Sequence, residues 1–191
     1  MKRGGDLAVA ALAGIVAVPL GLVIAVLLRW AADGPVLLRQ PRAGRHGRVF
    51  HVLRFRTDRR GRIGELLRRT GLDELPRLWN VARGEMGVIG PRPAHPEQVV
   101  GYDRRERARL AVRPGLTGWA QLQARGPSAR LSRPEWAELD LWYVEHRSLG
   151  LDLRILGLTV KALLCPADGT ADGASKGTAD GSSDGPVRSV R

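Results

Sequence analysis

The hydrophobic pattern divides the chain into a long apolar start and a more polar remainder. Between residues 7 and 28 no charged side chain occurs. A helix of about 20 apolar residues is long enough to cross the hydrocarbon core of a membrane. A cleaved signal peptide is the alternative, because Lys2 and Arg3 give a basic start, but the run is long for a signal core and no convincing cleavage site follows it. We therefore expect a membrane helix that is retained.

The flanking charges and one proline indicate how this helix lies in the membrane. Basic residues stand on both sides of it, Lys2 and Arg3 before it and Arg29 after it. Basic flanks favour the cytoplasmic face, and a straight span cannot place both of them there. Pro19 lies near the middle, where proline removes a backbone hydrogen bond. We expect a re-entrant helix that breaks at Val18–Pro19 and leaves on the side where it entered; a straight span that contains a proline is the alternative.

Weaker patterns predict the elements of the remaining chain. Alternating apolar and polar residues predict a strand at Val49–Phe55, and helical spacing predicts helices at 64–70, 75–82, 95–113, 133–148 and 152–164. Pro114-Gly115 suits a type II turn with a positive φ at the glycine, and Gly118 suits a close approach of backbone or ligand. The predicted fold class is α/β and helix-rich, with a short β element and amphipathic helices at the membrane surface.

Composition changes again near the carboxyl terminus. Residues 166–191 repeat Gly, Thr, Ala and Asp and contain almost no large apolar side chain, so we expect a disordered tail. The predicted organisation is a membrane helix over 1–32, one globular domain over 33–165 and the tail over 166–191.

The charge balance narrows the class of partner. The sequence has 31 Lys and Arg residues against 19 Asp and Glu, a net charge of +12. This excess favours nucleic acid, acidic lipid or phosphorylated substrates as partners. The single cysteine, Cys165, excludes an internal disulfide framework and a Cys-rich metal site, and the four histidines show no metal-ligand spacing.

Two adjacent carboxylates, Asp73 and Glu74, stand between arginines in the stretch RRTGLDELPRLWNV. In the simplest interpretation they cap and begin a helix, where Asp and Glu are favoured. The same position has a chemical use, because an aspartate at a helix start can attack phosphorus where exposed N–H groups attract phosphate. The adjacent glutamate could hold a divalent cation or handle a proton. These two residues alone leave both interpretations open.

Several residues around the dyad are candidate ligands. Arg68 and Arg69 lie about one helical turn before it, and Arg92 lies in GPRP, where two prolines fix the backbone. A guanidinium in a rigid loop loses less freedom when it binds a phosphate, although a purely structural Gly-Pro loop fits equally well. Trp119, in RPGLTGWAQ, either stacks on a nucleobase or fills the core.

The order and spacing of several long motifs resemble the bacterial sugar transferases, the monotopic phosphoglycosyl transferases that start envelope glycan assembly. The resemblance rests on the Pro-containing hydrophobic helix, GPVLLRQPRAGRHGRVFHVLRFRT, LRRTGLDELPRLWNV, GEMGVIGPRP, RPGLTGWAQ and LDLWYVEHRSLGLDLRIL. It covers the chain up to about Cys165. It implies transfer of a sugar 1-phosphate from a nucleotide sugar, usually a UDP-sugar, to a membrane polyprenyl phosphate such as undecaprenyl phosphate, with release of the nucleoside monophosphate.

The resemblance also implies roles for individual residues. Asp73 would carry a covalent phosphosugar, and Glu74 would bind Mg²⁺ with it or orient the incoming phosphate. Residues implied as phosphate or substrate ligands are Arg68, Arg92, Arg113, Trp119 and Gln121. The implied location is the bacterial cytoplasmic membrane, with the re-entrant helix among membrane lipids, the catalytic domain 33–165 on the cytoplasmic side and no nucleic acid as partner.

Two departures from the family pattern bear on these expectations. Val18 stands where a serine is frequent, and Gln123-Ala124-Arg125 stands in place of the usual Asn-Gly-Arg after WAQ. We associate the second stretch with nucleotide-sugar binding, so the change concerns the donor and leaves the dyad intact. Two rival interpretations therefore stay open: a noncatalytic basic membrane protein that binds anionic lipid or nucleic acid, and a family member that acts as a scaffold or regulator.

Overall fold

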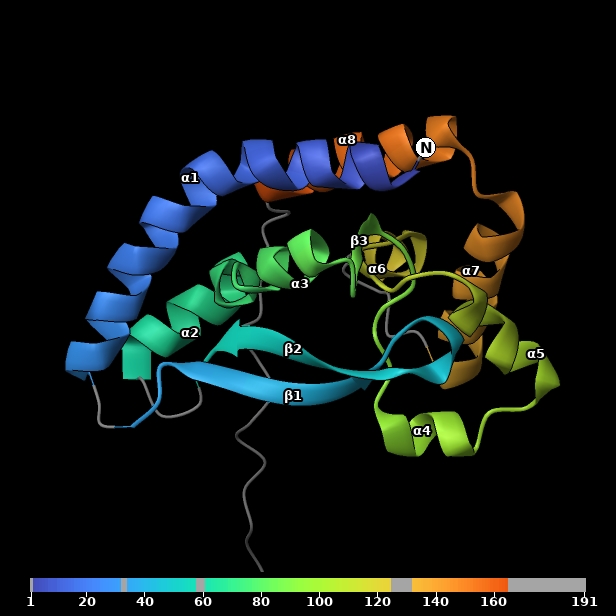
Figure 1. Ribbon diagram of the computed structural model, residues 1–191, viewed down its shortest axis with the longest axis horizontal. Helices are drawn as coiled ribbons and strands as arrows, with labels where there is room; N and C mark the ends of the chain where they lie inside the picture. The colour runs from blue at the N-terminus through green and yellow to red at the C-terminus, as the bar shows by residue number, and fades with distance from the viewer. Residues whose placement is uncertain (1, 32–33, 58–60, 125–131, 165–191) are drawn as a thin grey trace, which may run out of the picture.

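The structure, a computed structural model, describes residues 2–31, 34–57, 61–124 and 132–164. Its longest element is helix α1 (Lys2–Ala31), which bends as it passes over the other elements (Figure 1). The helix is continuous through Pro19, so the predicted break at Val18–Pro19 is wrong. One proline removes a single backbone hydrogen bond, and a helix can bend at such a position without ending. The tail over 166–191 lies outside the described residues.

Helix α1 packs on the rest of the molecule near both of its ends. Near the amino end, the Asp6 carboxylate accepts a hydrogen bond from the backbone N–H of Val88 at 3.1 Å. Near the other end, Ile24 and Leu28 are buried in one core cluster with Phe55. The helix middle differs, because its apolar side chains are 63–71% exposed at Leu12, Ile15, Val16 and Val18.

An antiparallel hairpin lies below α1 and positions the candidate site (Figure 1). It consists of β1 (Leu37–Ala43) and β2 (Val49–Phe55), joined by the short 3-10 helix η1 (Arg45–Gly47). The strand predicted at Val49–Phe55 is confirmed. The sequence patterns missed β1, which contains Pro41; proline is tolerated in an edge strand, and both strands of a two-stranded sheet are edges.

The dyad segment lies between two helices. Helix α2 (Gly61–Thr70) is followed by the 3-10 helix η2 (Leu72–Glu74) and then by α3 (Arg77–Arg83). Gly71 makes the turn between α2 and η2 with a left-handed φ of 72°, a conformation that glycine adopts without steric cost. Both helices predicted here are confirmed, and α3 begins after Pro76.

A buried asparagine fastens α3 to the hairpin. The Asn80 amide nitrogen donates to the carbonyl oxygen of His51 at 2.8 Å and to Glu85 Oε2 at 2.7 Å. Its Oδ1 accepts from the N–H of Leu53 at 3.1 Å. Since buried amides must be hydrogen-bonded and these bonds are directional, Asn80 fixes α3, and the dyad before it, over β2.

Two three-residue strands, β3 (Gly87–Ile89) and β4 (Gly115–Thr117), pair in parallel beside the hairpin. Glycine is required here for space: a Cβ on Gly115 would lie 2.2 Å from Gly90 N, and one on Gly118 would lie 2.2 Å from Gly90 O. The close approach predicted at Gly118 is confirmed. The positive φ predicted at Gly115 is wrong, because the residue belongs to an extended strand and φ there lies outside the left-handed region.

Further helical elements cover the far end of the hairpin and the back of the molecule. They are α4 (Pro96–Val100), α5 (Arg104–Arg107), η3 (Ala108–Ala111), α6 (Trp119–Gln123), α7 (Arg133–His146) and α8 (Leu149–Leu164). The last two confirm predicted helices. The single helix predicted over 95–113 is wrong, because Gly101 ends α4 and Asp103 caps a new helix by accepting from the Glu106 N–H at 2.7 Å.

Replacing Gly118 with alanine should lower the free energy of unfolding by roughly 1–3 kcal/mol, because the new methyl group would collide with a backbone oxygen that cannot move aside. Chemical denaturation of the membrane-reconstituted protein measures this. Gly157→Ala is the matched control: that glycine is inside α8, and apart from its own helix backbone no described atom lies within 4 Å of its Cβ position, so the substitution should raise stability by up to about 1 kcal/mol. Equal effects of the two substitutions would contradict the packing described for Gly118.

Candidate active site

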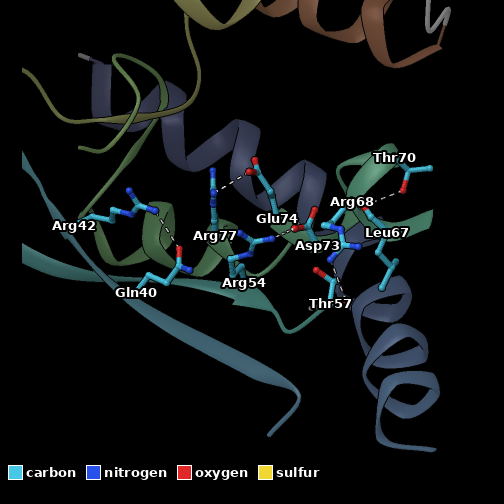
Figure 2. A network of polar contacts seen from close by, with 10 residues as sticks. All are labelled: Gln40, Arg42, Arg54, Thr57, Leu67, Arg68, Thr70, Asp73, Glu74 and Arg77. Carbon is cyan, nitrogen blue, oxygen red and sulfur yellow. Dashed lines mark hydrogen bonds and ion pairs between the residues drawn. The ribbon is translucent and has the colours of Figure 1, made fainter. Parts of the chain in front are cut away.

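Asp73 lies in η2 with its side chain buried, where the chain turns from α2 into α3. Arg54 reaches it from β2, and the Arg54 Nη2 donates to Asp73 Oδ2 at 2.6 Å (Figure 2). A charge-assisted hydrogen bond of this length fixes the orientation of the carboxylate and leaves Oδ1 outside the contact. The helix-capping interpretation of Asp73 is wrong for α3, whose N-cap is Pro76.

Glu74 has an arginine partner of its own. Its Oε1 lies 2.8 Å from Arg77 Nη2, one helical turn further along (Figure 2). Arg77 is buried, and burial lowers the pKa of its guanidinium. Glu74 and Asp73 raise that pKa, while Arg92 and Arg54 lower it. The two carboxylates and three arginines therefore lie close enough to influence one another.

Arg42 extends the same cationic region along the hairpin. Directly opposed residues of an antiparallel pair share a face, so the pairs Leu38↔Arg54 and Arg42↔Phe50 place both arginines on one face of the sheet. Burial lowers the pKa of Arg42, and Arg92 and Arg54 lower it further. Arg42 and Arg77 therefore each have Arg54 and Arg92 as cationic neighbours.

Among the described residues, the charge of this region is unbalanced. The cations are Arg42, Arg54, Arg77 and Arg92, and the carboxylates are Asp73, Glu74 and, at the edge beside Arg42, Glu97. In addition, the buried Nε atoms of Arg54 and Arg77 have no hydrogen-bond partner within the described ranges. Unpaired buried N–H groups are costly, and guanidinium groups match phosphate oxygens well. The arrangement is suited to binding a phosphate or diphosphate next to Asp73.

An apolar groove of about 760 Å³ opens beside this polar region. Leu75 and Pro76, which directly follow the dyad, form part of its wall. The concave side of α1 contributes the opposite wall through small and apolar residues such as Gly14, Ala17 and Val18. A charged site that is joined to an apolar groove can receive a ligand with a charged head and a hydrocarbon chain.

The structure brings only some of the expected site residues together. Asp73, Glu74 and Arg92 share the cationic region. Arg68 lies next to it at the end of β2, where its Nη1 donates to the Thr57 carbonyl oxygen at 3.1 Å (Figure 2). Arg68 is therefore engaged with the backbone in this structure, and its predicted phosphate contact stays a prediction.

Other expected site residues have different surroundings. Arg113 lines a separate cavity of about 160 Å³ with Asp6. Trp119 is half-buried and packs on Trp142 with ring centroids 5.3 Å apart, a contact that leaves open whether it also stacks on a base. Gln121 has a buried amide nitrogen that is unpaired among the described residues. None of these described contacts reaches the dyad, and their roles as substrate ligands stay predictions. The stretch Gln123-Ala124-Arg125, which departs from the family pattern, lies at the end of α6. Gln123 is the last residue of this helix, Ala124 is its C-cap, and Arg125 lies outside the described residues.

Sequence reasoning missed Arg42, Arg54 and Arg77. A signal existed for two of them: Arg54 occupies a core-facing position of an alternating strand, and Arg77 stands three residues after Glu74, at the spacing of a helical ion pair. Arg42 gave no such signal, because β1 itself was not predicted.

The dyad fits a divalent cation that shares its coordination with a substrate. Within the described residues no group of three or more His, Cys, Asp or Glu side chains could hold a metal alone. Arginines engage Oδ2 of Asp73 and Oε1 of Glu74, and the second oxygen of each carboxylate lies outside these contacts. Mg²⁺ is commonly bound by one or two carboxylates together with phosphate oxygens, so this donor set is suitable for it.

Comparison with known proteins gives a consistent result. Residues 1–166 match the family model described as bacterial sugar transferase. The chain is 37% identical over 153 residues to the uncharacterized sugar transferase EpsL of Bacillus subtilis, covering 72% of this chain and 74% of the relative. It is 36% identical over 186 residues to the UDP-glucose:undecaprenyl-phosphate glucose-1-phosphate transferase of Escherichia coli, covering 84% of this chain and 39% of the relative.

A third relative is similar over nearly its whole length. The exopolysaccharide production protein PSS of Rhizobium leguminosarum is 34% identical over 200 residues, covering 88% of this chain and 98% of the relative. Several of the larger relatives are much longer, and the chain spans between about a third and two fifths of their length. The match over 166 of 191 residues confirms the resemblance expected from the motifs: the chain belongs to the bacterial sugar transferase family.

Proposed function

We propose that the protein transfers a sugar 1-phosphate from a nucleotide sugar, with UDP-sugars as the first class to test, to undecaprenyl phosphate. The products are the polyprenyl-diphosphate sugar and the nucleoside monophosphate, at the start of exopolysaccharide assembly. One observation carries the proposal: a buried aspartate lies among surplus arginines directly beside an apolar groove. The names of the relatives, which include transferases of glucose 1-phosphate and N-acetylgalactosamine phosphate, support it.

The reaction follows from the orientation of Asp73. Arg54 holds Oδ2, so Oδ1 is the oxygen that attacks the phosphorus bearing the sugar. An aspartyl O–P bond forms, and the P–O bond to the nucleoside monophosphate breaks. In the second step an oxygen of undecaprenyl phosphate attacks the same phosphorus and restores the free carboxylate. Arg77 and Arg92 stabilise negative charge that moves among the phosphate oxygens.

Mg²⁺ is the cofactor that we propose, held by Asp73 and Glu74 together with substrate oxygens. When bound, it neutralises part of the charge of the diphosphate. The carboxylate Oε1 of Glu74 keeps Arg77 in place at the same time.

The groove and α1 suggest how the protein meets its lipid acceptor. We place the polyprenyl chain in the groove next to Leu75 and Pro76, with its phosphate toward Asp73. Because both ends of α1 pack on the same body while its middle exposes apolar side chains, a re-entrant helix keeps every contact, whereas a straight span must break those of Asp6 or of Leu28. The catalytic domain then lies on the cytoplasmic side, as the basic flanks favour.

Replacing Glu74 with glutamine should raise the Mg²⁺ concentration for half-maximal transfer by about tenfold or more, because a neutral amide is a weaker ligand. Glutamine keeps an oxygen for Arg77, so the fold should persist. Titrating Mg²⁺ in a nucleoside monophosphate release assay measures the effect. Glu65→Gln, which removes an exposed surface ion pair on α2, is the control and should leave the titration unchanged. A Glu74→Gln protein with the parental titration would contradict the metal role.

The overall reaction is tested with purified full-length protein in lipid nanodiscs that contain undecaprenyl phosphate. Labelled UDP-sugars and Mg²⁺ are added, and the label should appear in the lipid while UMP appears in the aqueous phase. Absence of both products across the common UDP-sugars and their nucleotide analogues would favour the scaffold interpretation instead.

A further inference from the structure

A second cavity, of about 360 Å³, lies at the end of the cationic region away from Asp73. Arg42 and Arg92 form the wall that the cavity shares with this region. Leu38 of β1 lies opposite Arg54 in the hairpin, and Arg42 lies four residues further along β1. This separation corresponds to about 13 Å at 3.3 Å per residue. The cavity is therefore displaced along the hairpin from the nucleophile and is connected to it by arginines.

The far wall of the cavity has a different chemical character. Arg109 lines it, and this guanidinium is paired with the buried Asp140 and lies 5.7 Å from the centroid of the Tyr102 ring. Burial raises the pKa of Asp140 to about 6 while Arg109 lowers it, and the ion pair between the two side chains offsets the charge of Arg109. Glu106 adds a negative charge to the same wall. A phosphate group is therefore favoured at the wall that contains Arg42 and disfavoured at the wall that contains Arg109 and Glu106.

The remaining lining residues match a nucleoside. Trp136, from α7, lines the cavity, and an indole ring can stack on a base. Gln98, from α4, uses its Oε1 to accept from the His95 N–H at 3.2 Å, and its amide nitrogen can donate to a carbonyl oxygen at the edge of a pyrimidine. A volume of about 360 Å³ falls in the range of small-molecule sites.

We propose that this cavity binds the nucleoside of the donor, with Trp136 and Gln98 as the residues that recognise the base. The assignment rests on the proposed function and adds the direction in which the nucleoside monophosphate leaves the reacting phosphorus. Asp73 attacks the phosphorus that bears the sugar, so the nucleoside monophosphate leaves on the opposite side of that phosphorus. Arg42 and Arg92 lie on the path from Asp73 to the cavity and hold the phosphate of the departing nucleotide.

The test compares two ligands that share a phosphorylated ribose and differ in the base. Binding of UMP and of ribose 5-phosphate to the full-length protein in nanodiscs is measured by calorimetry. The parent protein should bind UMP at least about tenfold more tightly. Gln98→Ala and Trp136→Ala should each weaken the binding of UMP and leave the binding of ribose 5-phosphate nearly unchanged. Most of the preference for UMP should therefore disappear. Val100→Ala is the matched control: it lies on the same helix as Gln98, is 80% exposed and should keep the full preference.

Two results would overturn the assignment: a parent protein that does not distinguish UMP from ribose 5-phosphate, or variants at both positions that keep the parental preference. Gln98 is exposed, and its truncation also removes the capping bond to the His95 N–H, so thermal unfolding of each variant identifies any loss of fold. These binding measurements do not require turnover. Base-dependent binding without any UMP release from UDP-sugars would support the cavity and contradict the proposed function, so the two can fail separately.

Discussion

Replacing Asp73 with asparagine should lower the rate of transfer at least about a thousandfold while the protein still inserts into membranes. Asparagine has nearly the same size as aspartate and keeps an oxygen that can accept a hydrogen bond from the Arg54 guanidinium. In the parent protein, Arg54 Nη2 lies 2.6 Å from Asp73 Oδ2. The substitution therefore removes the nucleophile and weakens one ligand of the proposed Mg²⁺, while the size and shape of the side chain are kept. The measurement is UMP release from a UDP-sugar by protein in nanodiscs that contain undecaprenyl phosphate.

Asp103→Asn is the matched control for this substitution. Asp103 caps α5 through its side chain, and asparagine is an equally good N-cap, so fold and rate should both stay close to the parental values. Full turnover by the Asp73→Asn protein would show that another group attacks phosphorus. The rates of all variants are compared at equal amounts of membrane-inserted protein.

Replacing Arg54 with glutamine should lower kcat by about a hundredfold, with a smaller change in the KM for the donor. Arg54 contacts Asp73 and not the nucleoside cavity, so its loss leaves a buried carboxylate without its cation and without a fixed orientation. Arg54→Lys keeps the charge but loses the planar fork and should recover part of the rate. Steady-state kinetics with varied UDP-sugar concentration separate the two parameters.

The control for Arg54 is Arg39→Gln. Arg39 is exposed on β1 and pairs with Leu53, so it lies on the face of the hairpin opposite Arg54. Loss of a surface arginine should leave kcat unchanged. If Arg54→Gln retained the parental kcat, or if both substitutions had the same effect, Arg54 would not position the nucleophile.

The parts of the fold that could be predicted from the sequence are those with strong local patterns. The strand Val49–Phe55 alternates apolar and polar residues, and α7 and α8 have helical apolar spacing. The strands β3 and β4 have three residues each and pair across a long stretch of chain, so their existence depends on tertiary contacts that no local pattern records. Gly115 shows the same limit, because the need for glycine comes from the backbone of Gly90.

The site was predictable in part for a related reason. Asp73 and Glu74 stand out because two adjacent carboxylates in a basic segment are chemically conspicuous. Arg54 is distant from them in sequence and reaches Asp73 only because the hairpin lies under η2. The continuous path of α1 through Pro19 was not predictable either, since a proline can end a helix or bend it, and the surrounding contacts decide which occurs.

The most direct test of the proposed reaction is to look for the phosphosugar on the protein itself. Full-length protein is mixed with a UDP-sugar and Mg²⁺ without undecaprenyl phosphate, quenched, digested and examined by mass spectrometry. A peptide containing Asp73 should gain the mass of one sugar phosphate, UMP should be released in equal amount, and later addition of undecaprenyl phosphate should remove the modification. A preparation that transfers sugar phosphate to lipid at full rate, yet never releases UMP before the lipid is added and never carries the modification, would contradict the two-step reaction.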